Sequence, residues 1–291
     1  MRVTVIIPTY YRAKDLSTLL DNILKQTVKP LEVIIVDDTP SDEVKVVYED
    51  KKEKFAKEGI NLIYVRNPKQ PSLTIARNIG VSIAKGEIIL FLDSDVIISS
   101  NYIENILRVF QMFPNALGVQ GHILIKKSIR NRLKFTLIDT LYKLFKLPHS
   151  TINSSCKIFE YPIYLTNITN CQWLSGSNMA FRREVFNEFK FDENLLKYAY
   201  MEDLLFTYSI YRKYPQSLYI TPFAKVIHKL SEEGRPKARI EHPYVRSCRK
   251  YVLSKLFGVK GLLTFALQTF GLVVFYILFS LRTLKDKHKN Q

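Results

Sequence analysis

Residues 86–95 read GEIILFLDSD, and this stretch decides the fold. The five consecutive apolar residues from Ile88 to Leu92 predict a strand that is buried on both faces. Two carboxylates, Asp93 and Asp95, follow directly where that strand would end. Because α/β sheets bind their ligands beyond the carboxyl ends of their strands, these two aspartates are the first candidates for a functional site.

Three earlier segments have the same β-branched, apolar character: Arg2 to Ile7, Glu32 to Val36 and Ile60 to Val65. Apolar residues at helical spacing separate them, at 16–24, 44–55 and 73–83. Strands that alternate with amphipathic helices predict a doubly wound, mainly parallel α/β sheet of the Rossmann type with helices on both faces.

Polar or turn-forming residues follow the strands and are the candidate binding residues: Pro8, Thr9, Tyr10, Asp37, Asp38, Asp93, Ser94 and Asp95. No Gly-x-Gly-x-x-Gly motif or Walker loop is present, so phosphates need another partner. Carboxylates that hold Mn²⁺ or Mg²⁺ meet this need. An Asp-x-Asp triplet taken alone is also common in turns and helix caps.

The chain of 291 residues is strongly basic, with a formal net charge of +16. This charge requires an anionic neighbour, which can be nucleic acid, lipid headgroups or a phosphorylated substrate. No nucleic-acid-binding signature is visible, and the cations crowd near an apolar C-terminal segment, so lipid is favoured over nucleic acid. Cys156, Cys171 and Cys248 form neither a zinc motif nor a disulfide framework, which fits a reducing compartment.

A series of short motifs runs along the chain: VIIPTY at 5–10, VDD at 36–38, ARNIG at 76–80, the opening stretch at 86–95, WLSGSNMAFR at 173–182, Glu202-Asp203 and His228. Each motif is modest, but together and in this order they resemble the family 2 glycosyltransferases of the GT-A fold. The resemblance covers most of residues 2–230. It implies a GT-A type sheet and transfer of a sugar from a nucleotide.

The resemblance also implies which residues hold the donor. Thr9, Asp38 and Arg77 would hold the nucleotide base and ribose, and Asp93 would contact the donor. The residue types agree with these roles, since a carboxylate accepts a base N–H or ribose hydroxyl and a guanidinium donates to a base carbonyl. The alternatives are a turn-forming aspartate at position 38 and a surface arginine at position 77.

By the same resemblance, Asp95 and His228 would bind the divalent metal and Asp203 would be the catalytic base. Oxygen and nitrogen ligands together suit Mn²⁺ or Mg²⁺, with the donor diphosphate completing the coordination. Taken alone, a histidine at a strand end such as His228 is more often a structural residue.

Four residues are candidates for binding the acceptor: Trp173, Gly176, Ser177 and Glu202. Trp173 is the only tryptophan, and its aromatic face suits a sugar, although a place in the core is equally compatible. The family often has an arginine several residues after Glu-Asp, where this chain has Tyr208. The Gln-x-x-Arg-Trp signature of processive synthases is absent, which favours transfer of a single sugar.

We therefore expect an inverting, metal-dependent glycosyltransferase. Its donor would be a UDP- or GDP-linked sugar, and its acceptor a membrane-associated glycan hydroxyl or polyprenyl phosphate. One alternative is an inactive, membrane-bound protein that binds nucleotide sugars, and another is a sugar-nucleotidyltransferase, which the missing N-terminal phosphate loop disfavours. The sequence leaves a homo-oligomer open.

The sequence divides into two predicted regions. Residues 1–235 would form the catalytic domain, with a nucleotide-sugar half at about 1–122 and an acceptor half at about 123–235. Residues 236–291 would form a helical, membrane-binding region.

A candidate transmembrane helix covers 261–281 within this C-terminal region. Leu262 to Leu281 carry no charge and, as a helix, would span about 30 Å, the thickness of a bilayer's hydrocarbon core. Basic residues flank both ends of the run, where anionic headgroups would lie. A nucleotide-sugar donor would keep the catalytic domain cytoplasmic; the alternative for 261–281 is a buried core helix.

Overall fold

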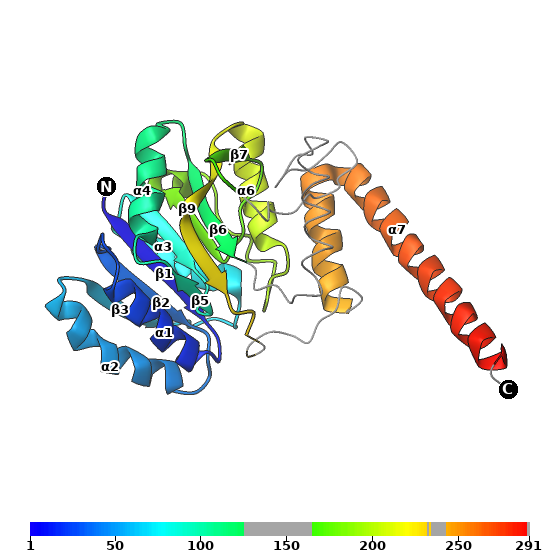
Figure 1. Cartoon of the computed structure of the whole chain (residues 1–291), viewed down its shortest axis with the longest axis horizontal. Helices are drawn as coiled ribbons and strands as arrows, with labels where there is room; N and C mark the ends of the chain where they lie inside the picture. The colour runs from blue at the N-terminus through cyan, green and yellow to red at the C-terminus, as the bar shows by residue number, and fades with distance from the viewer. Residues whose placement is uncertain (125–164, 232, 234–242, 290–291) are drawn as a thin grey trace.

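The computed structural model describes residues 1–124, 165–231, 233 and 243–289. One twisted sheet forms the body of the protein, with helices on both faces, and a long C-terminal helix extends away from it (Figure 1). The acceptor half that the sequence predicts includes residues 125–164, which lie outside the described residues.

The first half of the chain forms the parallel part of the sheet. Its elements are β1 (Val3–Thr9), α1 (Ala13–Leu24), β2 (Glu32–Asp37), α2 (Glu43–Lys57), β3 (Asn61–Arg66), α3 (Leu73–Ile83) and β4 (Ile88–Leu92). The strands lie in the order β3-β2-β1-β4, and all three pairs are parallel. The four strands and three helices predicted for this half are confirmed.

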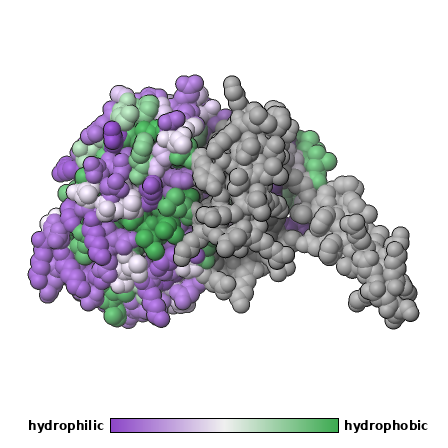
Figure 2. Space-filling model, in the orientation of Figure 1, coloured by the Kyte–Doolittle hydropathy of each residue, from purple (hydrophilic) through white to green (hydrophobic). Residues whose placement is uncertain are grey.

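Alternate residues of each strand enter separate hydrophobic cores, which explains why the strands are apolar without interruption. Val5 and Ile7 of β1 pack with Leu19 of α1 on one face. Ile6 packs with Ala76 of α3 on the other face. On the face seen in Figure 2, the surface over α2 is largely hydrophilic, as the outer side of an amphipathic helix requires.

The second half of the sheet corrects the prediction of a mainly parallel sheet. Its elements are β5 (Val96–Ile98), α4 (Tyr102–Met112), β6 (Gly118–Leu124), β7 (Thr169–Cys171), β8 (Asn178–Arg182), the 3₁₀ turn η1 (Arg183–Asn187), α6 (Glu202–Lys213) and β9 (Leu218–His228). The strand β8 pairs antiparallel with both β4 and β6, and β5 and β7 pair antiparallel with β9. Only β6 and β9 are parallel here, so the complete sheet is mixed.

The C-terminal helix α7 (Pro243–Lys289) contains a kink at Gly258, whose φ of 56° and ψ of −135° are not helical. The predicted helix at 261–281 is part of α7, but side chains from 270 onward lie outside the described residues. No helix within the described part of the chain is both long and apolar enough to cross a membrane, so the predicted span is not supported.

The part of α7 before the kink packs against the body of the protein. Val252 and Leu256 of α7 form a buried cluster with Leu204 and Leu205 of α6. Arg212 at the end of α6 donates a hydrogen bond of 2.7 Å to the Leu256 carbonyl. The beginning of α7 is therefore integrated with the element that carries the Glu202-Asp203 motif.

Candidate active site

A cavity of about 580 Å³ opens at the carboxyl ends of β1, β2 and β4. Six of the predicted binding residues line it: Pro8, Thr9, Tyr10, Asp38, Asp93 and Ser94. The order of the strands reverses between β1 and β4, because β2 and β3 lie on one side of β1 and β4 lies on the other. The cavity thus occupies the point at which a doubly wound sheet binds its ligand.

Asp38 is held rigidly in the wall of this cavity. Its carboxylate accepts hydrogen bonds from Asn67 Nδ2 at 2.6 Å and from the Ser72 backbone N–H at 3.0 Å. Burial raises the pKa of Asp38 to about 6, and the two hydrogen bonds oppose that rise. Asp38 therefore changes its charge close to neutral pH.

Asp37 occupies a different position from its neighbour. Its side chain is fully buried and accepts hydrogen bonds from the Tyr64 hydroxyl at 2.7 Å and the Thr39 N–H at 2.8 Å. It is absent from the lining of the cavity. Asp37 supports the turn after β2, so the structure gives no support to the predicted donor contact.

Arg77 is buried, with only 1% of its surface exposed, which corrects the alternative of a surface arginine. Its guanidinium pairs with Glu202, donates 2.9 Å to the Gly176 carbonyl and lies 3.6 Å from Asp93 Oδ1. It does not line the cavity in which a base would be bound. Arg77 instead connects the end of β4 with the start of α6.

Asp93, Asp95 and His228 form one cluster in which a ligand atom from each residue lies within 4.8 Å of the others. His228 Nε2 is 3.2 Å from Asp95 Oδ1 and 3.8 Å from Asp93 Oδ2. Strand pairing brings them together, because Val96 directly follows Asp95 and pairs with His228. Two carboxylates and an imidazole are a donor set that fits Mn²⁺ or Mg²⁺. The two predicted metal ligands, Asp95 and His228, thus lie together, and Asp93, which was predicted to contact the donor, adds a third ligand group to the cluster.

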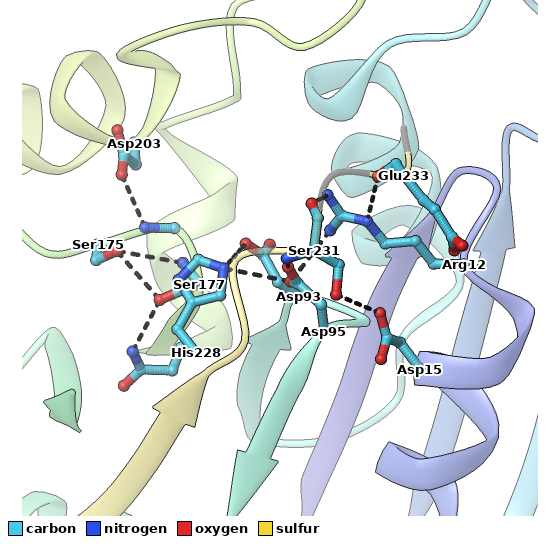
Figure 3. A network of polar contacts seen from close by, with 12 residues as sticks. Arg12, Asp15, Asp93, Asp95, Ser175, Ser177, Asp203, His228, Ser231 and Glu233 are labelled. Carbon is cyan, nitrogen blue, oxygen red and sulfur yellow. Dashed lines mark hydrogen bonds and ion pairs between the residues drawn. The ribbon is translucent and has the colours of Figure 1, made fainter. Parts of the chain in front are cut away.

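A ring of polar contacts surrounds Asp95 (Figure 3). Arg12 Nη1 lies 3.1 Å from Asp95 Oδ1, and the Ser231 N–H donates 3.0 Å to Asp95 Oδ2. Arg12 also donates to the backbone carbonyls of Ser231 and Glu233, and the Ser231 hydroxyl donates to Asp15. These contacts fix the carboxylate of Asp95, which is fully buried, and fasten the segment after β9 against α1.

Asp203 lies in the first turn of α6, on the other side of the Ser-Gly-Ser turn that precedes β8. Its carboxylate accepts 2.8 Å hydrogen bonds from the backbone N–H groups of Gly176 and Leu204. Burial raises the pKa of Asp203 above its usual value, although these hydrogen bonds oppose the shift. A higher pKa makes this carboxylate a better proton acceptor.

Gly176 is required where the two parts of the site meet. A Cβ atom at this position would come within 2.7 Å of Arg77 Nη2 and 2.9 Å of Glu202 Oε1. The neighbouring Ser177 carbonyl accepts a 3.0 Å hydrogen bond from the Asp93 N–H. The predicted acceptor residues Gly176, Ser177 and Glu202 therefore gather between the metal cluster and Asp203.

Trp173 is half-buried and packs against the cluster formed by α6 and α7. The structure therefore favours the packing role that the sequence left open.

Sequence reasoning missed Arg12, Ser231 and Tyr244. Tyr244, near the start of α7, lines the cavity beside Asp38 together with Lys197 and Tyr198. Arg12 lies four residues after Pro8, and this proximity to a predicted strand end was the one available signal. Nothing in the sequence indicates that a residue of the C-terminal helix reaches this cavity.

Comparisons with known proteins agree on one family. Residues 4–189 match the family model described as "Glycosyl transferase family 2". An uncharacterized glycosyltransferase of Nostoc sp. is 33% identical over 123 residues, which is 42% of this chain and 37% of that protein. The glucosyl-dolichyl phosphate glucuronosyltransferase of Haloferax volcanii is 24% identical over 239 residues, covering 80% of this chain and 70% of its own length. GlyA of Streptococcus pneumoniae is 22% identical over 191 residues, which is 66% of this chain and 26% of that protein. The chain thus spans well under half the length of the first curated relatives it matches.

Solved structures share the fold at low sequence identity. TarS 1-349 of S. aureus in complex with UDP-GlcNAc has a TM-score of 0.58 and 19% identity, covering 88% of this chain and 66% of that chain. GalNAc-T7 with UDP, GalNAc and Mn²⁺ has a TM-score of 0.64 and 16% identity, and the match covers 86% of this chain and 48% of that chain. These similarities establish a GT-A-like fold.

Proposed function

The chain belongs to glycosyl transferase family 2, and from this premise we propose that it is an inverting, metal-dependent glycosyltransferase. It transfers one sugar from a UDP- or GDP-linked donor to a membrane-associated acceptor. The observation that carries the proposal is the adjacency of three features: the cavity beside Asp38, the Asp93–Asp95–His228 cluster and the carboxylate of Asp203.

The cavity binds the nucleotide in this proposal. The Asp38 carboxylate, fixed by Asn67 and Ser72, accepts a hydrogen bond from the base or the ribose. Tyr10 is partly exposed at the rim, where its ring offers a face on which a base can stack. A hydrogen-bonded carboxylate and an aromatic face provide orientation without a glycine-rich phosphate loop.

The diphosphate end of the donor lies toward Asp93, Asp95 and His228. These residues would hold Mn²⁺ or Mg²⁺, which supplies positive charge to stabilise the diphosphate as it leaves. The contacts of Arg12 and Ser231 keep Asp95 oriented for this role. TarS and GalNAc-T7 provide support by analogy, since their structures contain UDP-GlcNAc and UDP with Mn²⁺, respectively.

Asp203 acts as the general base. Its carboxylate takes the proton of an acceptor hydroxyl while the hydroxyl oxygen attacks the anomeric carbon on the face opposite the diphosphate, so that the configuration inverts. The Gly176 N–H orients one carboxylate oxygen, and burial raises the pKa of the group. The leaving diphosphate carries its own negative charge and needs no acid, unlike the leaving group of a glycosidase.

The membrane-associated acceptor is supported by the C-terminal helix and by one relative. Val259, Leu263 and Leu267 of α7 are exposed apolar residues, and Lys250 and Lys260 are exposed cations nearby. Apolar side chains beside cations suit the surface of an anionic bilayer. The Haloferax relative is named for a dolichyl phosphate substrate. We propose association with the cytoplasmic surface of a membrane.

A panel of UDP- and GDP-linked sugars tests the proposal, with released nucleotide as the readout and with Mn²⁺, Mg²⁺ or EDTA present. We expect release from donors of one nucleotide class, loss of release in EDTA and recovery when metal is added back. The Asp203→Asn protein, purified in the same way, controls for contaminating hydrolases. If no donor binds or turns over under any condition, the proposed activity is wrong.

Membrane association has its own test, cosedimentation with vesicles. We expect the full-length protein to bind vesicles of anionic lipid and to bind neutral vesicles less well, with binding that weakens as salt increases. A variant with Val259, Leu263 and Leu267 changed to Ser should lose binding. Equal behaviour of the two proteins would contradict the role given to α7.

A further inference from the structure

The segment just before Asp203 has an unusual backbone. Lys197, Ala199 and Met201 have φ angles of 56°, 47° and 67°, although none of them is glycine. Residues with a side chain rarely adopt this left-handed region, and several within five positions persist only when the surroundings hold them there. Met201 is the residue that precedes the first turn of α6.

Part of the restraint comes from the start of α3. The Leu73 N–H donates 3.0 Å to the Lys197 carbonyl. The Ser72 and Thr74 hydroxyls both donate to the Leu195 carbonyl, at 3.1 and 2.9 Å. These contacts hold the beginning of the segment but do not reach Ala199 and Met201.

Tyr244 of α7 adds a restraint at the centre of the segment, where the Ala199 N–H also donates a 3.0 Å hydrogen bond to the Leu196 carbonyl. Its hydroxyl accepts a 2.8 Å hydrogen bond from the Ala199 N–H and donates one to the Leu196 carbonyl. The Ala199 carbonyl in turn accepts a 3.1 Å hydrogen bond from the Glu202 N–H. One hydroxyl of the C-terminal helix is thus two hydrogen bonds away from the backbone that carries Asp203.

The same side chain also faces the donor. Tyr244 lines the cavity beside Lys197 and Tyr198, the residues at the beginning of the left-handed segment. Burial raises the pKa of the Tyr244 hydroxyl, so it stays protonated and can donate at physiological pH. The segment therefore lies between the donor cavity and the general base Asp203, and Tyr244 contacts both the segment and the cavity.

We propose that Tyr244 is a positioning residue, whose hydroxyl holds residues 197–201 in the conformation that sets Asp203 and the adjoining wall of the donor cavity. The proposal rests on the proposed function for Asp203 and extends it to the C-terminal helix. The first turn of α7 is then a part of the active site, and its docking is a condition for catalysis.

Tyr251 offers a matched control on the same helix. Its hydroxyl donates 2.8 Å to Asp192 Oδ2, an oxygen that Lys255 also contacts. Tyr244→Phe and Tyr251→Phe each remove one hydroxyl that is hydrogen-bonded to the region before α6. Only the first removes a contact with the left-handed segment.

Amide hydrogen exchange on the full-length proteins measures the restraint without requiring activity. We expect Tyr244→Phe to accelerate exchange of the Ala199 and Glu202 amides about tenfold or more relative to the unaltered protein, and Tyr251→Phe to leave them within about twofold. Equal exchange at these amides in all three proteins would overturn the proposal. A protein that binds no nucleotide sugar would refute the proposed function but not this restraint.

Steady-state kinetics then separates positioning from simple packing. For a displaced base we expect kcat to fall about tenfold or more in Tyr244→Phe, since small misplacements of reacting groups are costly, with the donor KM changed about threefold or less. Tyr251→Phe should keep both constants. If Tyr244→Phe exchanges faster and still keeps its kcat, the hydroxyl holds the segment but does not position Asp203, and the proposal fails.

Discussion

Asp95 and Asp203 lie on the two sides of the active site, and the protein holds them by different means. Asp95 follows a central strand, is fully buried and contacts Arg12 and His228. Asp203 begins a helix and is held by two backbone N–H groups. The first carboxylate contacts cationic or cation-binding side chains directly, whereas the second is hydrogen-bonded to backbone amides and feels the charges of Arg77 and Asp93 without an ion pair to either.

This difference assigns different chemistry to one residue type. A carboxylate beside a guanidinium and an imidazole suits a fixed anion that binds a metal. A carboxylate whose pKa is raised by burial suits the acceptance of a proton. Environments that give two carboxylates separate roles are a general feature of enzyme sites. The predictions below test whether the two sides can be impaired independently.

The largest expected effect is that of Asp95→Asn. Loss of one anionic ligand should abolish metal-dependent binding of the donor, and with it turnover, because a hard cation needs the charge. Calorimetric titration of donor with and without Mn²⁺ measures this. Asp42→Asn, which alters an exposed carboxylate paired with Arg66, should bind as the unaltered protein does. An Asp95→Asn protein with undiminished metal dependence would refute the metal site.

Asp203→Asn should separate the second side from the first. We expect turnover to fall roughly 10²-fold or more while donor affinity stays nearly intact, because only the general base is lost. Single-turnover rates and calorimetry measure the two quantities. A mild defect would indicate a polyprenyl phosphate acceptor, whose oxygen is already anionic and needs no base. Loss of donor binding with normal turnover of bound donor would contradict the assignment.

Arg77→Lys tests the connection between the two sides. Lysine keeps the charge but cannot bind Glu202 and the Gly176 carbonyl together, as the guanidinium does. Loss of one charged hydrogen bond in a buried site should lower the free energy of unfolding by about 1.5–3 kcal/mol. Urea unfolding measures it, with the partly exposed Arg66→Lys as control, for which we expect less than about 1 kcal/mol. Equal stabilities would show that Arg77 does not join the two sides.

The two sides also differ in how far the sequence predicts them. On the side of Asp95, strands with both faces buried leave continuous apolar runs, so β1 to β4 and the residues after them follow from the pattern. On the side of Asp203, β8 pairs antiparallel with β4, and no local pattern encodes that choice of partner or direction. The prediction of a mainly parallel sheet therefore holds for β1 to β4 and not for the second half of the sheet.

Contacts between distant segments account for the remaining differences. His228 approaches Asp95 only because β5 pairs with β9. The spacing of the two residues in the sequence does not indicate this proximity, and the prediction that they share a metal came from the family resemblance. The buried pairing of Arg77 with Glu202 was not foreseen, since the two residues lie far apart along the chain. Tyr244 was not predicted as a site residue because its position depends on how α7 packs against the rest of the protein, which no local sequence pattern indicates.

The smallest expected effect concerns Asp38 on the nucleotide side. Its pKa of about 6 means that the carboxylate is almost fully ionised at pH 7.5 and about one-quarter ionised at pH 5.5. If the ionised form accepts a hydrogen bond from the nucleotide, donor affinity should fall about fourfold between these pH values. Calorimetry with a nucleotide sugar measures it. A nucleotide sugar is preferred to free UDP as the ligand, because its diphosphate is esterified at both ends and lacks the phosphate group that titrates near pH 6 in UDP.

The sign of this effect separates binding from folding. Because the folded-state pKa of Asp38 is higher than the usual value of 3.8, its contribution to stability is largest at low pH and is lost as pH rises through about 6. Acidification from pH 7.5 to 5.5 thus favours folding at this residue while it weakens binding, so unfolding linked to Asp38 does not explain a loss of affinity. Asp38→Asn should bind the donor weakly and with the fourfold pH dependence removed, and any dependence left belongs to other groups. An Asp38→Asn protein that keeps the full pH dependence would show that Asp38 is not the titrating group. A different residue would then have to accept the hydrogen bond from the nucleotide.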